Sequence, residues 1–181
     1  GAVPAHITKG QNYETLFSSM FLHASWGHLL GNMLFLWIFA DNIEATIGNI
    51  RFLLFYFLGG LAAHAGHIYF NMDSTIVSVG ASGAISAVMG AYLVMFPASR
   101  IKMLFLLFIF RIPAFVFLGF WAFQQYIGLE QLHAGGQVNT GGVAWWAHIG
   151  GFIFGALVGF YFRGKGYLRT SNYAIQTRKN E

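Results

Sequence analysis

The stretch AHIGGFIFGALVG, residues 147–159, carries a glycine at every fourth position from Gly151 through Gly155 to Gly159. Residues four apart lie on one face of an α-helix, so these glycines form a stripe without side chains. Stripes of small residues let the backbones of two membrane helices approach closely. The stretch therefore predicts a helix that packs tightly against another helix inside a membrane.

The composition of the whole chain also indicates a membrane protein. Hydrophobic residues make up 56% of the 181 residues and charged residues only 9%, whereas soluble domains carry about 25% charged residues. The same composition excludes intrinsic disorder, a collagen and a nucleic-acid-binding module. Because the chain has no cysteine, disulfides, thiolate metal sites and a cysteine nucleophile are excluded as well.

Five apolar stretches are candidates for helices that cross the membrane. A spanning helix needs about 20 residues, and the third and fifth stretches are shorter. Short helices in lipid indicate an end that is buried in protein or lines a wet cavity. The sequence therefore predicts an all-α, polytopic membrane helix bundle over residues 1–162. Its predicted spans cover residues 26–47, 52–70, 82–96, 103–127 and 146–162.

The basic residues predict the orientation of these spans. If the five stretches alternate, eight of the ten Lys and Arg residues lie on one side, which the positive-inside rule assigns to the cytoplasm. Residues 163–181 then form a basic cytoplasmic tail, and residues 1–22 lie outside a bacterial-type plasma membrane. Because residues 1–22 do not resemble a signal peptide, we expect a further helix before them, which makes six in all.

Two polar side chains near the start of the first predicted helix are candidates for a site, because polar groups inside a span are rare and often functional. His28 and Asn32 are four residues apart and share one helix face. They could donate hydrogen bonds to one point. His23 is five residues before His28 and is expected to precede the helix. The alternative for His28 and Asn32 is hydrogen bonding between helices.

The segment Gly80-Ala81-Ser82-Gly83 opens the third predicted helix. A serine at a helix N-terminus has an accessible hydroxyl and free backbone N–H groups beside it. The flanking glycines let a substrate backbone approach closely. The alternative is a helix cap followed by small-residue packing.

His148 opens the fifth predicted helix and lies on its glycine stripe. The third predicted helix carries a matching stripe of small residues at Gly83, Ala87 and Ala91. If the two stripes pack, His148 arrives beside Ser82. An imidazole at that place could accept the proton of the hydroxyl, which a serine nucleophile requires.

A serine nucleophile also needs hydrogen-bond donors where the carbonyl oxygen becomes negative. His28, Asn32 and the backbone N–H of Ser82 are candidates for that role. The carboxylates of Asp41 and Glu44 lie about 20 Å from His28 along the first helix, at 1.5 Å per residue. No acid is therefore placed to complete a triad, and the residues predict a Ser–His dyad.

These motifs, in this order on separate helices, resemble those of the rhomboid family of intramembrane serine proteases. The resemblance covers about residues 16–162 and implies a core of six helices, of which this chain carries the last five. It also implies that Ser82 is the nucleophile, that His148 is the general base, and that His28 and Asn32 bind the oxyanion. The motifs are His23-x4-His28-x3-Asn32, Gly80-x-Ser82-Gly83 and Ala147-His148-x2-Gly151-x3-Gly155.

The resemblance assigns structural roles to the glycines. Gly80, which with Gly83 flanks the nucleophile segment, would shape the nucleophile loop. Gly151 and Gly155 would let the fifth helix pack closely. Some members carry a tyrosine four residues after the nucleophile that packs on the catalytic histidine, and Ser86 stands at that position here. The substrates implied are transmembrane helices of other proteins, with no cofactor and no metal.

The route of substrate and water follows from the same picture. We expect a cavity open to the outer side near residues 71–81 to supply water. A substrate helix would enter from the bilayer past the fourth predicted helix. Arg111 and Pro113 interrupt that helix, so we expect it to be the mobile one.

Other functions stay open from the sequence. One is a catalytically silent rhomboid-like protein that binds membrane clients. Another is a transporter or channel component, which is disfavoured because the polar groups within the spans cluster at one end. His64 and His67 could share a metal, although a third ligand is not apparent. Gln124 and Gln125 could contact substrate or form interfacial hydrogen bonds.

Overall fold

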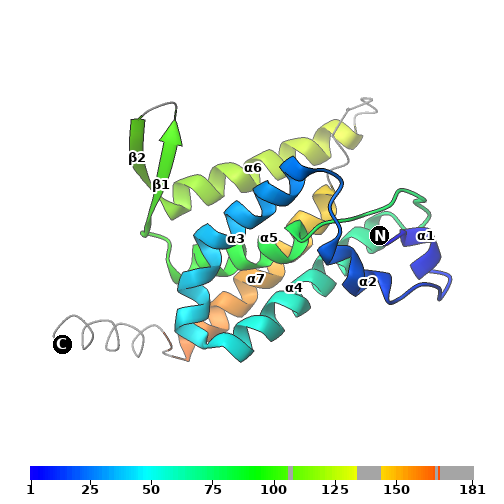
Figure 1. Ribbon diagram of the computed structural model, residues 1–181, viewed down its shortest axis with the longest axis horizontal. Coiled ribbons are helices and arrows are strands. Elements are labelled where there is room, and N and C mark those ends of the chain that lie inside the picture. Colours follow the sequence, from blue (N-terminus) through cyan, green and yellow to red (C-terminus); the bar gives the residue numbers. More distant parts are fainter. Residues whose placement is uncertain (106–107, 134–143, 166, 168–181) are drawn as a thin grey trace.

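The computed structural model describes residues 1–105, 108–133, 144–165 and 167. The described part is mostly helical, with long helices arranged around a shorter central one (Figure 1). The elements in chain order are α1 (Pro4–Ile7), α2 (Thr15–Ser18), the 3-10 helix η1 (Ser19–Phe21), α3 (Trp26–Ile47), α4 (Asn49–Phe70), α5 (Ser82–Met95), β1 (Arg100–Phe105), β2 (Phe108–Pro113), α6 (Ala114–His133) and α7 (Trp145–Gly164).

The central element is helix α5, which contacts α3, α4, α6 and α7. All of its residues except Ser82 and Leu93 are buried. Such complete burial is possible because α5 contains many small residues, which let neighbouring backbones come close. The N-terminal end of this central helix therefore lies inside the protein, where a polar residue is shielded from lipid.

The glycine stripe of α7 packs on the small residues of α5. A Cβ added to Gly151 would collide with the carbonyl oxygen of Gly83, and one added to Gly155 would collide with that of Ala87. Gly159 continues the same close contact toward the C-terminal part of α5. The contact between the two stripes that the sequence predicts is therefore confirmed.

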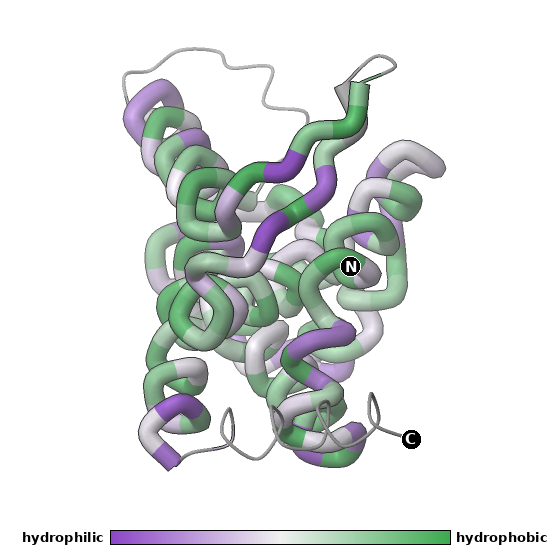
Figure 2. Tube along the Cα trace, turned by 90° about the vertical axis from the view of Figure 1, so that its left-hand side faces the viewer, coloured by the Kyte–Doolittle hydropathy of each residue, from purple (hydrophilic) through white to green (hydrophobic). Residues whose placement is uncertain are grey.

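The outer surface of the bundle is apolar. Figure 2 shows hydrophobic residues along most of the helices, with hydrophilic ones mainly near helix ends and in strands β1 and β2. Large apolar side chains are exposed on each long helix, for example Trp37, Leu58, Phe120 and Leu157. Such a surface suits lipid better than water. Among the described residues, α4 and α7 are both long and apolar enough to cross a membrane, and α5 is apolar but shorter.

The prediction of a helix over residues 103–127 is wrong at its start. Strands β1 and β2 form an antiparallel pair there, and α6 begins only at Ala114 and continues to His133. Strand β2 contains two isoleucines and two phenylalanines, which favour extended backbone, while Pro113 lacks the N–H that a helix interior needs. The described part of the chain is therefore mostly helical and not all-α, and strands β1 and β2 project away from the helices (Figure 1).

The other predicted spans differ little from the observed helices. Helix α3 has the predicted bounds, and α5 ends at Met95, one residue earlier than predicted. Helix α4 begins at Asn49 and not at residue 52, and α7 covers Trp145–Gly164 in place of residues 146–162. The glycine-rich stretch 135–142 and nearly all of the predicted tail lie outside the described residues.

The chain before α3 fixes the segment that leads into α5. Ala2 and Ser78 exchange two backbone hydrogen bonds, of 2.9 and 2.7 Å. The backbone N–H of Gly80 donates to the carbonyl of Ser19 at 2.9 Å. Through these bonds, the N-terminal part of the chain holds residues 78–80 in place, shortly before the first residue of α5.

Candidate active site

Ser82 and His148 are in direct contact. Ser82 is the first residue of α5, and His148 lies in the first turn of α7. The distance between Ser82 Oγ and His148 Nε2 is 2.8 Å, which is the length of a hydrogen bond from a hydroxyl. The close packing of α5 on α7 brings the two residues together, although 66 positions separate them in the chain.

Gly80 shapes the turn that presents Ser82. Its φ angle is +116°, a conformation that residues with a side chain rarely adopt. A Cβ on Gly80 would also lie only 2.6 Å from Cε1 of His28. Both the backbone angle and the available space therefore require glycine at this position.

His28 and Asn32 lie on α3 beside this turn. The hydroxyl of Ser25 caps the helix by accepting a hydrogen bond from the backbone N–H of His28 at 3.1 Å. Asn32, one turn later, is buried, and its Nδ2 has no hydrogen-bond partner within the described residues. A buried donor without a partner costs about 1–3 kcal/mol, so this amide group is available to a bound ligand.

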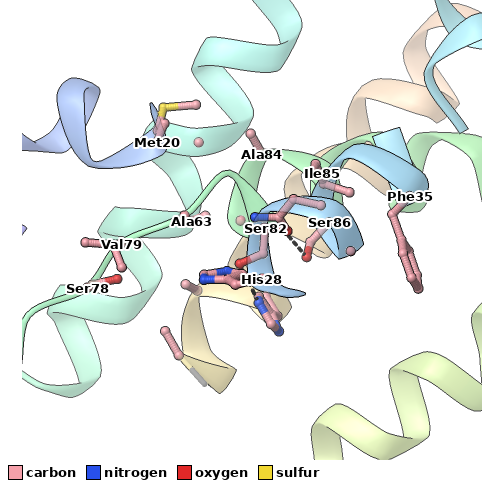
Figure 3. Close-up of a pocket in the computed structure, with 18 of the residues that line it drawn as sticks. Met20, His28, Phe35, Ala63, Ser78, Val79, Ser82, Ala84, Ile85 and Ser86 are labelled. Carbon is pink, nitrogen blue, oxygen red and sulfur yellow. Dashed lines mark hydrogen bonds between the residues drawn. The ribbon is translucent and has the colours of Figure 1, made fainter. Parts of the chain in front are cut away.

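A cavity of about 420 Å³ connects these side chains. Its walls are formed by residues of η1, α3, α4, α5, α6 and α7 and of the segments before α3, α5 and α7. Ser82, His148, His28 and Asn32 all line it, and Figure 3 shows His28 and Ser82 among the side chains at its wall. The cavity can therefore hold part of a ligand between a hydroxyl, two imidazoles and an amide.

His23 supports the wall of the cavity from outside α3. It precedes the helix, as the sequence predicts, and its ring packs edge-on against that of His28 with centroids 5.2 Å apart. This contact limits how far the His28 ring can turn.

Ser86 hydrogen-bonds within its own helix. Its hydroxyl donates to the carbonyl of Ser82 at 2.6 Å, which is a common way for a serine to satisfy itself inside a helix. This bond uses the donor of Ser86 and leaves the orientation of His148 to other residues.

The second nitrogen of His148 is bound by a residue of α6. His148 Nδ1 lies 2.8 Å from Oε1 of Gln125. The rings of Trp121 and Trp145 also contact the imidazole, with centroid distances of 5.9 and 6.4 Å. The sequence points to Gln125 as a polar residue in an apolar helix, but it does not reveal this partner. The contact was therefore missed at the level of the sequence.

A second serine–histidine pair lies deeper in the protein. Ser19 Oγ and His64 Nε2 are 3.0 Å apart, and Ser19 has 0% of its surface exposed. His64 lines the cavity, whereas Ser19 does not. The hydroxyl of Ser19 is thus closed off from any ligand in the cavity, while that of Ser82 is not.

The two histidines of α4 do not belong to a larger cluster of potential metal ligands. Within the ranges that the structure describes, no group of three or more His, Cys, Asp or Glu residues could hold a metal ion. His64 pairs with Ser19, and the carbonyl of His67 accepts a hydrogen bond from Asn71 at 2.8 Å.

The sequence was also compared with known proteins. A family model described as the rhomboid domain matches residues 10–165, which include every residue of the three motifs. The chain belongs to the rhomboid family. Membership implies a polytopic helix bundle in a membrane, in agreement with the apolar outer surface of the helices.

This rhomboid resembles proteins from several kinds of organism. It is 29% identical over 151 residues to "Rhomboid protein 1, mitochondrial" of Saccharomyces cerevisiae. It is 40% identical over 80 residues to "Putative rhomboid protease YdcA" of Bacillus subtilis. It is 29% identical over 147 residues to "Presenilin-associated rhomboid-like protein, mitochondrial" of Homo sapiens. Because these relatives come from mitochondria and from a bacterium, the family alone does not determine which membrane holds this rhomboid.

This rhomboid corresponds to only part of those relatives. The alignments cover 81%, 44% and 76% of this chain, in the same order, but 41%, 40% and 35% of the relatives. The chain therefore spans less than half of the length of the curated relatives named here.

Proposed function

We propose that this rhomboid is an intramembrane serine endopeptidase that hydrolyses peptide bonds in or near transmembrane helices of other membrane proteins. Ser82 is the nucleophile and His148 is the general base. The observation that supports this assignment best is the 2.8 Å contact between Ser82 Oγ and His148 Nε2 at the wall of a cavity.

The reaction follows from this contact in two halves. Ser82 Oγ bonds to the substrate carbonyl carbon while its proton passes to His148 Nε2. The tetrahedral intermediate collapses, His148 returns the proton to the leaving amine, and the acyl group remains on Ser82. Water then gives a proton to His148 and bonds to the same carbon. Finally, Ser82 regains its proton and the new carboxylate leaves.

The oxyanion of both intermediates is stabilised by Asn32, His28 and the backbone N–H of Ser82. The free Nδ2 of Asn32 supports this role, because a buried donor without a partner gains most when a negative oxygen arrives. Removing one such donor in other serine proteases costs about 10²–10³ in kcat.

The substrate class and the setting form part of the proposal. A helix of the substrate enters from the bilayer past α6, which packs much less extensively on its neighbours than α4 and α7 do. Residues 1–162 form the catalytic membrane domain, and residues 163–181 form a basic tail on the cytoplasmic side of a bacterial-type plasma membrane. The chemistry uses neither a cofactor nor a metal.

Three variants test the proposal. We expect the purified protein in liposomes to cleave a labelled model membrane helix and to react with a fluorophosphonate probe. Ser82→Ala and His148→Ala abolish both reactions. Ser19→Ala, which removes the hydroxyl of the other serine–histidine pair, leaves both reactions in place.

Two results would overturn the proposal. Cleavage that persists in Ser82→Ala would exclude Ser82 as the nucleophile, and probe labelling that disappears only in Ser19→Ala would move the reaction to the buried pair. A wild-type protein that binds the model helix without cleaving it would support the alternative of a silent client-binding rhomboid.

A further inference from the structure

The imidazole of His148 is held at both of its nitrogens. Nε2 contacts the Ser82 hydroxyl, and Nδ1 lies 2.8 Å from Oε1 of Gln125 on α6. Gln125 is only 5% exposed although its helix lies at the outside of the bundle. A buried glutamine beside an imidazole needs partners for both ends of its amide, because an unpaired polar group inside a protein is costly.

The other end of this amide fixes which atom faces His148. Nε2 of Gln125 donates to the carbonyl oxygen of Trp121, one turn earlier on α6, at 3.2 Å. In the reversed orientation the amide oxygen would face that carbonyl oxygen, and two acceptors would repel each other. Gln125 therefore presents Oε1, a pure acceptor, to Nδ1 of His148.

An acceptor at Nδ1 determines the tautomer of the ring. A neutral imidazole carries one proton, and Nδ1 must bear it in order to donate to Gln125. Nε2 is then left with a lone pair directed at the hydroxyl of Ser82. This is the form that a general base requires, because the lone pair receives the serine proton.

We propose that Gln125 is the positioning residue of the dyad, which holds His148 in the tautomer and orientation that activate Ser82. This inference rests on the proposed function and adds a third member that neither the motifs nor Ser86 supply. Gln125 takes the place that a carboxylate has in a triad, but it is neutral. It keeps accepting the Nδ1 proton when the ring becomes an imidazolium, so the bond persists through proton transfer.

Because Gln125 belongs to α6, the orientation of His148 depends on the position of that helix. A second cavity, of about 220 Å³, lies between α6 and α7 and is lined by Gln125 together with Trp121, Ala122, Ile149, Phe152 and Ile153. Apolar packing across this seam is therefore incomplete, and the hydrogen bond from His148 to Gln125 is a polar link across it. A shift of α6 relative to α7 would therefore change the orientation of the His148 ring.

The tautomer can be measured without any assay of proteolysis. In the protein labelled with ¹⁵N-histidine, with the His148 signals identified by their loss in His148→Ala, we expect Nδ1 to carry the proton. In Gln125→Leu we expect both tautomers in comparable amounts. A wild-type His148 protonated at Nε2 would overturn the inference even if the protein is an active protease, whereas an inactive protein with Nδ1 protonated would overturn only the proposed function.

Kinetics separate a positioning role from a structural or substrate-binding one. Gln125→Leu should lower kcat about tenfold or more, as expected for one hydrogen bond lost from the transition state, with KM unchanged. Gln125→Glu keeps an acceptor and should recover much of kcat, with the acidic limb of the pH profile moved to higher pH because a carboxylate favours the protonated ring. Gln11→Leu, the same change at an exposed position outside α6, should match the wild type. A Gln125→Glu variant no better than Gln125→Leu, or a rise in KM alone, would refute the positioning role.

Discussion

Gly155 of α7 lies so close to the backbone carbonyl of Ala87 on α5 that no side chain fits between the two helices. The same close approach occurs one turn earlier, at Gly151. Because Ser82 and His148 lie at the end of this seam, the distance between their reacting atoms depends on how closely the two backbones approach.

Replacing Gly155 should therefore damage both stability and activity. The methyl group of Gly155→Ala meets a backbone atom that cannot rotate away, and overpacking of this kind costs roughly 1–3 kcal/mol. We expect a lower midpoint of thermal unfolding in detergent and slower labelling of Ser82 by a fluorophosphonate. Gly119→Ala on α6 is the matched control, since a Cβ there meets nothing within 4 Å. Equal midpoints for the two variants would contradict the packing that the structure gives.

Gly80→Ala should affect the site more than the fold. The added methyl group pushes against the ring of His28, and the φ angle of +116° is strained for alanine. Gly10→Ala is the control for strain alone, because Gly10 has a φ of +79° and an added Cβ would meet only the hydroxyl of Tyr13, at an ordinary contact distance of 3.8 Å. We expect both variants to lose similar stability, of about 1 kcal/mol, and only Gly80→Ala to lose most of its cleavage rate. A comparable loss of activity in Gly10→Ala would show that strain, and not His28, is responsible.

Asn32→Leu should separate stability from catalysis. The variant removes a buried donor that has no partner within the described residues, so we expect the thermal midpoint to stay the same or rise. The cleavage rate should fall by about 10²–10³ if the amide stabilises the oxyanion. Measuring kcat and the midpoint on the same preparation tests both statements. A variant that is less stable but equally active would make Asn32 a structural residue.

Tyr92→Phe should act only on stability. Nδ2 of Asn42 donates to the hydroxyl of Tyr92 at 3.0 Å and links α3 to α5, and neither residue lines the cavity. Loss of one hydrogen bond of this kind costs about 0.5–1.5 kcal/mol. Equilibrium unfolding in detergent measures that difference, and kcat should remain that of the wild type. A fall in kcat with no change in unfolding would point to a coupling between Asn42 and the site.

Much of the helical part of the fold could be predicted from the sequence. Long apolar runs and the spacing of glycines are local signals, and they gave the bounds of α3 and the pairing of α5 with α7. Strands β1 and β2 were missed because an apolar run in a membrane protein suits a helix and a strand about equally. Only the pairing with a second strand, which no single stretch reveals, decides between the two.

The site shows the same division. His148 lies on the glycine stripe of α7 and Ser82 directly precedes the stripe of α5, so the packing of the two stripes predicts their meeting, and they are in contact. Gln125 could not be found in this way, because its relation to His148 depends on how α6 leans against α7 and not on any repeat. The pair of Ser19 and His64 could not be predicted either, because Ser19 lies in a short 3-10 helix whose sequence has no repeating pattern.

The shortness of α5 determines where a bound polypeptide would be cut. Its 14 residues extend about 21 Å, roughly 9 Å less than the hydrocarbon thickness of a bilayer. In the proposed orientation, which puts the C-terminal end of α5 and Arg100 at the cytoplasmic surface, Ser82 would lie several ångströms beneath the outer one. Under the proposed function, cleavage at this depth gives two products. The outer product keeps only a few apolar residues of the transmembrane helix and can diffuse into water, while the other keeps most of the helix and stays in the bilayer. Under that proposal, a single hydrolysis event would divide a membrane-anchored polypeptide into a released fragment and a fragment that stays in the membrane.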